Sequence, residues 1–209
     1  MADIGNLYVI AAPSGAGKTT LVNTLVETMP RLTVSISHTT RAKRPNEQHG
    51  VNYYFIDVAE FKRLIEHGDF LEYATVFENY YGTSKKWVTD TLNQGIDVIL
   101  EIDWQGHQQI KRLFPDTISI FILPPSIAAL RERLITRNQD NAATIQKRLA
   151  DVRETVSHIH EFNYVVINDD FEHACQDLRA IINGGRLVEK RQTARFSSMI
   201  KDLTEMGAV

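Results

Sequence analysis

The fold of this chain is decided near its beginning, by the stretch Leu7-Tyr8-Val9-Ile10-Ala11-Ala12-Pro13-Ser14-Gly15-Ala16-Gly17-Lys18-Thr19-Thr20. An apolar run, a glycine loop and an apolar pattern at helical spacing follow one another, as in a phosphate-binding P-loop. Gly15 and Gly17 allow successive backbone N–H groups to point inward, beside the positive end of the new helix. Lys18 can reach terminal phosphates, and the Thr19 hydroxyl can ligate Mg²⁺. The stretch predicts binding of a nucleoside triphosphate.

One position departs from the strict P-loop pattern. Ala12 stands where the first glycine is usual, and alanine is the smallest replacement for it. The alternative is an ordinary glycine turn before a helix. The strand, the Gly-Lys-Thr sequence and the helix together favour the P-loop.

Composition limits the class of protein. The chain has 209 residues, of which 43% are hydrophobic, enough for one compact domain. Its formal net charge is −3, so binding of phosphate must depend on local clusters of basic residues. Cys175 is the single cysteine, which leaves no intramolecular disulfide. Apolar runs stay well below the roughly 20 residues of a membrane span, and the first residues lack a signal-peptide pattern. We expect a soluble, cytoplasmic protein that binds neither nucleic acid nor membranes.

Short apolar runs alternate with helical patterns along the chain. The runs have the character of buried parallel strands and cover 7–10, 97–102, 118–123 and 164–167. The helical patterns cover 18–29, 85–93, 105–113, 127–136, 142–159 and 171–182. The alternation predicts an α/β fold in which helices flank a central parallel sheet and ligands bind at the carboxyl ends of the strands.

Three stretches depart from this alternation. Residues 34–83 hold one short helical pattern, 58–66, and predict a small mixed insert. Polar residues 137–141 separate two charged helices and predict the tip of a lid at about 133–148. The pair Gly184-Gly185 is expected to stop the preceding helix. The tail 186–209 is expected to form an amphipathic helix, packed on the domain or on a second subunit, because apolar residues recur there at helical spacing: Phe196, Met199, Ile200 and Leu203.

The insert contains a candidate phosphate clamp. Arg41 and Arg44 lie beside hydroxyl residues, and the planar fork of arginine pairs well with phosphate oxygens. Several tyrosines and Glu72 follow them. A solvated basic turn with surface tyrosines fits the composition equally well, so this evidence leaves both interpretations open.

Several motifs occur in the order found in guanylate kinases. They are the P-loop, Ser37-His38-Thr39-Thr40-Arg41 with Arg44, Asn79-Tyr80-Tyr81-Gly82-Thr83, Glu101-Ile102-Asp103-Trp104-Gln105-Gly106 and Val166-Ile167-Asn168-Asp169-Asp170. The chain resembles this family from about residue 7 to residue 186. The resemblance implies a domain at 5–184, with a P-loop core at 5–33 and 84–184, a GMP-binding insert at 34–83 and a lid. It also implies transfer of the γ-phosphate of ATP to GMP or dGMP, with Mg²⁺ as cofactor.

The resemblance assigns expected roles to individual residues. In the GMP site, the residues expected to hold the phosphate are Arg41, Arg44, Tyr53 and Tyr81. Those expected to face the base are Ser37, Glu72, Thr83 and Asp103. The expected ATP site comprises the P-loop residues Ala12, Pro13, Ser14, Gly15, Ala16, Gly17, Lys18, Thr19 and Thr20, together with Arg133, Arg137 and Asn168. The expected catalytic residues are Lys18, Arg41, Arg137 and Arg148.

The chemistry of guanine agrees with Glu72 as the residue that reads the base. Guanine presents N1–H and its 2-amino group side by side, and one carboxylate accepts from both. Adenine presents a bare acceptor at N1, which a carboxylate repels. A site built to bond a polar group rejects the analogue that lacks it by about 10⁴–10⁵-fold. The transfer itself needs no general base, because the attacking phosphate oxygen of GMP is already anionic.

The acidic end of the run 97–103 has the position of a Walker B element. Thr19 is expected to ligate Mg²⁺, with Glu101 and Asp103 orienting the metal's water ligands. Glu101 departs from the aspartate expected in the family. The alternative for these carboxylates is to cap the helix that follows, which fits Glu101 as well.

The predicted lid contains three arginines. Arg133 and Arg137 lie four residues apart and share a helix face, and Arg148 follows the polar tip. Helix arginines are usually solvated, but the resemblance implies that these close over the triphosphate.

Two rival functions remain open at this point. One is a guanylate-kinase-like interaction module without catalysis, which the intact Lys18 and the lid arginines disfavour. The other is a P-loop kinase for a different phosphorylated acceptor, such as a ribose bisphosphate. The combination of Glu72, Tyr81 and Thr83 favours a purine monophosphate instead.

Overall fold

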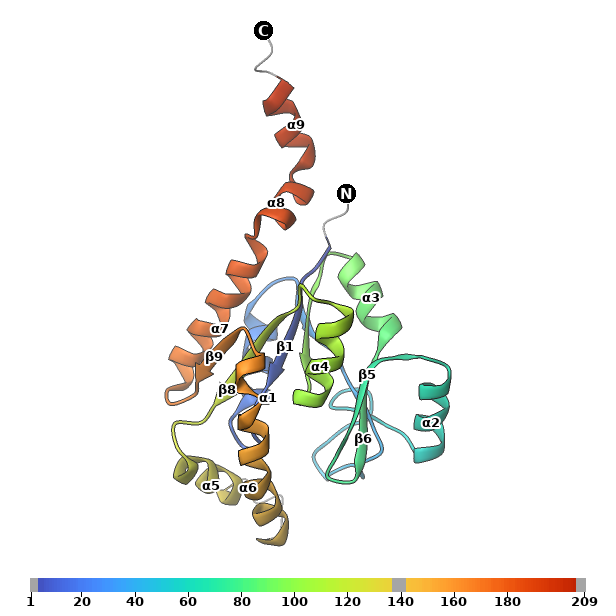
Figure 1. The fold of residues 1–209 in the computed structure, drawn as a ribbon, viewed down its shortest axis with the longest axis vertical. Helices are drawn as coiled ribbons and strands as arrows, with labels where there is room; N and C mark the ends of the chain where they lie inside the picture. Colours follow the sequence, from blue (N-terminus) through green and yellow to red (C-terminus); the bar gives the residue numbers. More distant parts are fainter. Residues whose placement is uncertain (1–3, 137–141, 206–209) are drawn as a thin grey trace.

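The computed structural model describes residues 4–136 and 142–205, and its core is a five-stranded parallel sheet (Figure 1). The strand order is β2-β7-β1-β8-β9. The strands are β1 (Leu7–Ala11), β2 (Leu32–Val34), β7 (Asp97–Glu101), β8 (Ile118–Leu123) and β9 (Tyr164–Ile167). The four predicted runs are therefore strands of one sheet, which confirms the α/β prediction. β2 was not predicted, because three residues next to the insert carry too little periodic signal.

Helices cover both faces of this sheet. On one face, α1 (Lys18–Thr28) and α7 (Phe171–Arg186) pack on Tyr8 and Ile10. On the other face, α3 (Lys85–Asn93) and α4 (Trp104–Leu113) pack on Leu7 and Val9. Successive side chains of β1 point to opposite faces, so a continuous apolar strand supplies both layers of the core.

The insert forms a second, mixed sheet beside the core (Figure 1). It comprises β3 (His38–Thr39), β4 (Tyr54–Phe55), β5 (Phe70–Val76) and β6 (Asn79–Ser84) in the order β4-β3-β6-β5, with α2 (Val58–Glu66) alongside. α2 confirms the one helical pattern expected there. Phe61 anchors α2 to the sheet, because its buried ring packs at centroid distances of 4.6 Å from Phe70 and 5.3 Å from Tyr80.

Two helices at the end of the molecule opposite the tail contain the described part of the predicted lid (Figure 1). They are α5 (Ile127–Thr136) and α6 (Ala142–Ser157), and the short 3₁₀ helix η1 (Ile159–Glu161) follows. Their shared core contains Leu130, Leu134 and Val152. α6 ends two residues before the predicted end. The predicted tip at 137–141, and with it Arg137, lies outside the described residues.

The expected helix stop at Gly184-Gly185 is wrong, because α7 continues through both glycines to Arg186. Gly185 serves close packing instead. A Cβ atom there would lie 2.6 Å from the Tyr8 hydroxyl and 2.6 Å from Cδ1 of Ile118. A side chain at this position would push α7 off the sheet, which the local sequence pattern does not reveal.

Beyond α7 the chain leaves the body of the molecule as a tail made of α8 (Glu189–Arg195) and α9 (Ser197–Glu205) (Figure 1). The predicted helical spacing is confirmed, although the tail contains two helices where one was expected. Among the helices that the structure describes, each is too short or too polar to cross a membrane.

Candidate functional site

The P-loop wraps the start of α1 and depends on its glycines. Gly15 and Gly17 both have φ near +93°, a left-handed conformation that side chains disfavour. A Cβ on Gly17 would also lie 2.3 Å from Nδ2 of Asn168. That amide donates a 2.7 Å hydrogen bond to the Ala16 carbonyl. Asn168, which belongs to the expected ATP site, is therefore buried behind the loop and holds its shape.

Strand register places an acidic residue beside the P-loop. Glu101, the last residue of β7, pairs with Ile10 just before the loop leaves β1. Its Oε2 accepts a 2.9 Å hydrogen bond from the Thr19 hydroxyl and lies 3.7 Å from Nζ of Lys18. Glu101 thus contacts the P-loop side chains and does not cap α4. The capping residue is Asp103, which accepts a 3.0 Å hydrogen bond from the Gly106 amide.

Two lid arginines reach the P-loop from the other side. Arg133 donates to the Ala16 carbonyl of the loop at 3.5 Å and to the Asn168 carbonyl beside it at 3.0 Å. Arg148, on α6, donates to the Ser14 hydroxyl at 2.9 Å. The lid therefore brings positive charge to the edge of the loop where a bound triphosphate would add negative charge. The third predicted lid arginine, Arg137, is outside the described residues and is not placed.

The predicted phosphate clamp is assembled around Glu47, which sequence analysis missed. Glu47 accepts from the Arg41 guanidinium at 2.7 Å and from the Arg44 amide at 2.9 Å. The guanidinium carbon of Arg41 lies 5.4 Å from the ring centre of Tyr53, whose ring packs edge-on at 6.0 Å from that of Tyr81. Acidic residues in basic turns give no distinctive signal, so the bridging role of Glu47 became evident only in three dimensions.

The carboxylate predicted to read the base lies deep in the insert. Glu72 on β5 pairs with Thr83 on β6, and the Thr83 hydroxyl donates to its Oε1 at 2.6 Å. A Cβ on Gly106 would lie 2.4 Å from the other carboxylate oxygen, so the absence of a side chain there leaves room for Glu72. The insert therefore binds this carboxylate through Thr83, and the start of α4 leaves space for it at Gly106.

Burial shifts the proton equilibria at this end of the site. The pKa of Glu72 is raised to about 7, mainly by desolvation; the Thr83 hydrogen bond opposes this shift, and the nearby charge of Asp103 adds to it. Desolvation also raises the pKa of Asp103. Tyr53 has a pKa of about 12, raised by burial and then by Tyr81 and Glu101, so it is a neutral O–H donor at pH 7.

All of these elements open onto one cleft of about 1900 Å³, larger than the 300–1000 Å³ typical of a single small ligand. The predicted site residues lining it are the whole P-loop from Ala12 to Thr20 and Ser37, Arg41, Arg44, Tyr53, Glu72, Tyr81, Glu101, Asp103, Arg133 and Arg148. Thr83 and Asn168 stand behind this lining, against Glu72 and Ala16. The cleft thus brings the P-loop together with the paired arginines and the buried carboxylate of the insert.

The lid and the insert also touch across the mouth of the cleft. Nζ of Lys147 on α6 lies 2.9 Å from Oε1 of Glu78 and 5.9 Å from the ring centre of Phe77. Phe77 and Glu78 form the turn between β5 and β6, and both have positive φ. Both polar partners are more than half exposed, so this contact contributes little to stability by itself.

The oxygen atoms beside the P-loop suit Mg²⁺, which is usually held by one or two protein oxygens together with substrate phosphates and water. The Thr19 hydroxyl and the Glu101 carboxylate provide such oxygens. Within the described ranges, histidine, cysteine and carboxylate side chains form no cluster of three that could hold a metal without a nucleotide.

A P-loop that shares one cleft with the arginines of α5 and α6, and with an arginine pair and a buried carboxylate from the insert, is typical of a P-loop phosphotransferase. Comparison with known proteins gives the family. The family model described as guanylate kinase matches residues 4–184. The chain therefore belongs to the guanylate kinase family, in agreement with the resemblance seen in its motifs.

Individual relatives match over nearly their whole length. The guanylate kinase of Coxiella burnetii is 54% identical over 200 residues, covering 96% of this chain and 97% of the relative. That of Alcanivorax borkumensis is 55% identical over 203 residues, covering 97% and 98%. The crystal structure of guanylate kinase from Anaplasma phagocytophilum superposes with a TM-score of 0.77 at 34% identity, covering 91% of this chain and 90% of that one.

Proposed function

We propose that this chain transfers the γ-phosphoryl group of ATP to GMP, giving ADP and GDP, and that the residues lining its cleft carry out the transfer. The observation that carries this proposal is the buried Glu72 carboxylate in the same cleft as the P-loop and the Arg41–Arg44 pair. A triphosphate, a monophosphate and a guanine ring then each have a matching set of protein groups. dGMP has the same phosphate and the same base as GMP and lacks only the 2′-hydroxyl. It would therefore bind to the same protein groups.

In the GMP site, the phosphate lies against Arg41 and Arg44, with Tyr53 and Tyr81 donating hydroxyl hydrogen bonds. Arginine suits this task because it pairs bidentately with phosphate oxygens. Glu47 holds the Arg41 guanidinium and the Arg44 backbone, so the clamp is preorganised.

At the base end of the GMP site, Glu72 accepts hydrogen bonds from N1–H and the 2-amino group of guanine. Thr83 holds the Glu72 carboxylate from behind, and Asp103 and Ser37 complete the wall of the cleft. Adenine would leave the buried carboxylate without donors, and that cost is the basis of base selection.

In the ATP site, the P-loop amides and Lys18 surround the β- and γ-phosphates. Arg133 and Arg148 neutralise charge on the transferring group when the lid closes, and Arg137 is assigned the same role on family resemblance alone. Thr19 and Glu101 would hold Mg²⁺, which would neutralise part of the charge of the triphosphate.

The reaction then proceeds by positioning and electrostatics. An anionic phosphate oxygen of GMP attacks the γ-phosphorus in line, and the bond from that phosphorus to the β–γ bridging oxygen breaks. Tyr53 keeps its proton because its pKa is about 12, so it acts as a hydrogen-bond donor and not as a base. Lid closure excludes water, which would otherwise accept the phosphoryl group.

The proposal is tested by a coupled ADP-release assay with Mg-ATP and GMP, dGMP, AMP, CMP or UMP. Turnover confined to GMP and dGMP is expected. Binding of guanine nucleotides without turnover would instead identify a non-catalytic interaction module. Neither binding nor turnover would mean that the insert has been misinterpreted.

A further inference from the structure

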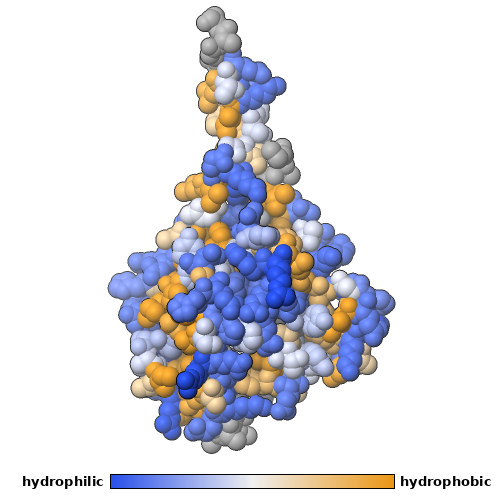
Figure 2. All heavy atoms as spheres, viewed as in Figure 1, coloured by the Kyte–Doolittle hydropathy of each residue, from blue (hydrophilic) through white to orange (hydrophobic). Residues whose placement is uncertain are grey.

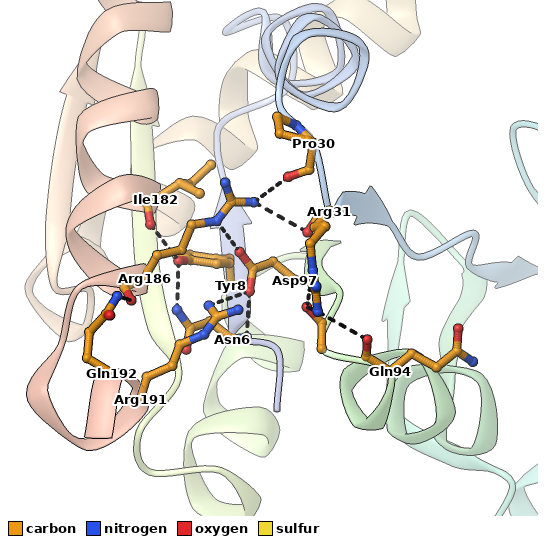
Figure 3. Close-up of polar contacts among 11 residues, drawn as sticks. Asn6, Tyr8, Pro30, Arg31, Gln94, Asp97, Ile182, Arg186, Arg191 and Gln192 are labelled. Carbon is orange, nitrogen blue, oxygen red and sulfur yellow. Dashed lines mark hydrogen bonds and ion pairs between the residues drawn. The ribbon is translucent and has the colours of Figure 1, made fainter. Parts of the chain in front are cut away.

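The tail leaves the body of the molecule at a base that is held by buried ion pairs (Figure 3). Asp97, 1% exposed at its side chain, lies 2.6 Å from Nε of Arg186 and 2.7 Å from Nη1 of Arg191. The Asn6 backbone donates to the same carboxylate at 2.8 Å. Figure 2 shows the tail standing clear of the body beyond this base. Removing one partner of a buried ion pair is strongly destabilising, so these contacts fix the direction of the tail.

The predicted lid projects at the opposite end (Figure 1), and two stacked rings hold its return to the core. His158 directly follows the last residue of α6 and precedes η1. Its imidazole lies on the indole of Trp104, the first residue of α4, with ring centroids 3.7 Å apart and planes 6° from parallel. The stack therefore joins the end of the lid helix to the start of a core helix.

A second pair of side chains holds the imidazole in place. Nδ1 of His158 lies 2.6 Å from Oε1 of Glu161, and because an ionised carboxylate only accepts hydrogen bonds, Nδ1 is the donor. Nε2 of Gln108 donates to the two oxygens of Glu161 at 3.0 and 3.2 Å. Gln108 comes four residues after Trp104 and hence lies on the same face of α4. Trp104, Gln108, His158 and Glu161 are called the lid-base cluster below.

The chain that follows the lid-base cluster is anchored in the core by another residue. The Phe162 ring stacks on His107 of α4 at a centroid distance of 4.1 Å and packs edge-on against Phe121 of β8 at 5.0 Å. Both of these partners are buried. Removal of the His158 ring would therefore leave the core packing in place and release the end of α6. The lid-base cluster thus sets the direction of α6 and is not needed to hold the core together.

Both sides of the lid-base cluster lead into the cleft. Trp104 follows Asp103, and both residues line the cleft. On the other side, α6 carries Arg148, which donates to the Ser14 hydroxyl of the P-loop at 2.9 Å. Arg148 comes ten residues before His158, which is about 15 Å along the helix axis. A tilt of roughly 10° at His158 would move Arg148 by about 2.5 Å, and a misplacement of about 1 Å can cost roughly 100-fold in rate.

We propose that His158 is a positioning residue for the phosphoryl transfer. Its stack on Trp104, held by Glu161, sets the direction of α6 and so the place at which Arg148 meets the P-loop. His158 lies outside the described lining of the cleft, so it acts through α6 and Arg148. The inference rests on the proposed function, because that function gives Arg148 its role in the transfer.

Turnover of single and double variants tests this route. His158→Ala should lower kcat about tenfold and change the KM for GMP by less than about threefold, because Arg148 is displaced while the GMP site is intact. His158→Phe keeps a ring on Trp104 and should restore most of kcat. In the Arg148→Ala background, His158→Ala should have almost no further effect, because the group through which it acts is gone. His160→Ala, at an exposed histidine on η1, is the matched control and should keep the wild-type kcat.

Spin labels measure the direction of α6 without any turnover. Cys175 is buried, so labels can be attached selectively to Gln146→Cys on α6 and Arg112→Cys on α4, both at exposed positions. In double electron–electron resonance, His158→Ala should shift or broaden the label distance by about 3 Å, from a tilt of roughly 10° over about 18 Å of helix. His158→Phe and His160→Ala should keep the wild-type distance.

Three results would overturn the proposal. They are a double variant whose loss in kcat is the product of the two single losses, equal kcat in His158→Ala and His160→Ala, and an unchanged label distance in His158→Ala. Wild-type protein without turnover would count against the proposed function, and the label distances would then decide whether His158 directs α6.

Discussion

The Thr83 hydroxyl lies 2.6 Å from Oε1 of Glu72, and both side chains are buried between β5, β6 and the start of α4. The hydrogen bond favours the ionised carboxylate, whereas desolvation opposes ionisation. Thr83 therefore acts on the base through Glu72: it helps to keep a buried acceptor charged and correctly oriented. Base selection in this account rests on that pair.

Thr83→Val tests the pair, because valine has nearly the shape of threonine and lacks the hydroxyl. Hydrogen bonds to charged groups are worth about 1.5–3 kcal/mol, so the KM for GMP at pH 7 should rise roughly tenfold. The KM for ATP should not change. Thr91→Val is the matched control, since the Thr91 hydroxyl is also hydrogen-bonded, to the Trp87 carbonyl in α3 and away from the cleft. Equal KM values for GMP in wild type and Thr83→Val would show that the Thr83 hydroxyl does not help Glu72 to bind GMP.

GMP binding should weaken as the pH falls through neutrality. Glu72 has a pKa of about 7, and the donors of guanine bind only its ionised form. Below pH 7 protonation competes with GMP, so its dissociation constant should rise by up to about tenfold per pH unit. The phosphate of GMP also titrates, near pH 6 by analogy with other phosphate monoesters. Glu72→Gln separates the two contributions, because glutamine does not titrate. The pH dependence of GMP binding that remains in this variant should come from the phosphate alone. Identical profiles in calorimetric titrations of the two proteins would contradict the assignment.

Arg148→Ala should lower turnover with little effect on GMP binding. Arg148 approaches the P-loop through Ser14 and belongs to the ATP side of the cleft. Loss of one preorganised donor to a transition state costs about 10²–10³ in kcat. The control is Arg153→Ala, an exposed arginine on the same helix. Wild-type kcat in Arg148→Ala, measured with saturating ATP and GMP, would exclude a catalytic role for the lid arginine.

Glu101 is tested by two substitutions that separate charge from reach. Its carboxylate contacts Thr19 and Lys18. Glu101→Gln removes the charge and should lower kcat by about 10–100-fold and raise the Mg²⁺ concentration for half-maximal rate, as for other groups that orient metal ligands. Glu101→Asp keeps the charge but has a shorter side chain. Its kcat and its Mg²⁺ concentration for half-maximal rate should lie between those of Glu101→Gln and those of the wild type. Asp90→Asn, exposed on α3, is the control. An unaltered Mg²⁺ dependence in Glu101→Gln would assign Glu101 a structural role only.

The sequence predicted those features that depend on local pattern. The P-loop was predictable because a strand, two glycines and a helix are adjacent in sequence, and the core strands because buried runs are short and apolar. Gly185 was misinterpreted, because glycine at a helix end and glycine at a close contact look alike in sequence. Only the fold brings it against Tyr8. The bridging position of Glu47 and the ion pairs of Asp97 were likewise beyond prediction, since they join residues through tertiary contacts.

The measurement that tests the central claim most directly is the ratio of kcat/KM for GMP to that for AMP, in wild type and in Glu72→Gln. Glutamine can still accept one hydrogen bond but also presents an amino group, which clashes with one guanine donor and suits the bare N1 of adenine. The ratio should fall by at least about 100-fold in Glu72→Gln, out of a total selectivity of roughly 10⁴–10⁵. The KM for ATP should stay within about threefold of wild type. An unchanged ratio would show that another group reads the base and would contradict the proposed site.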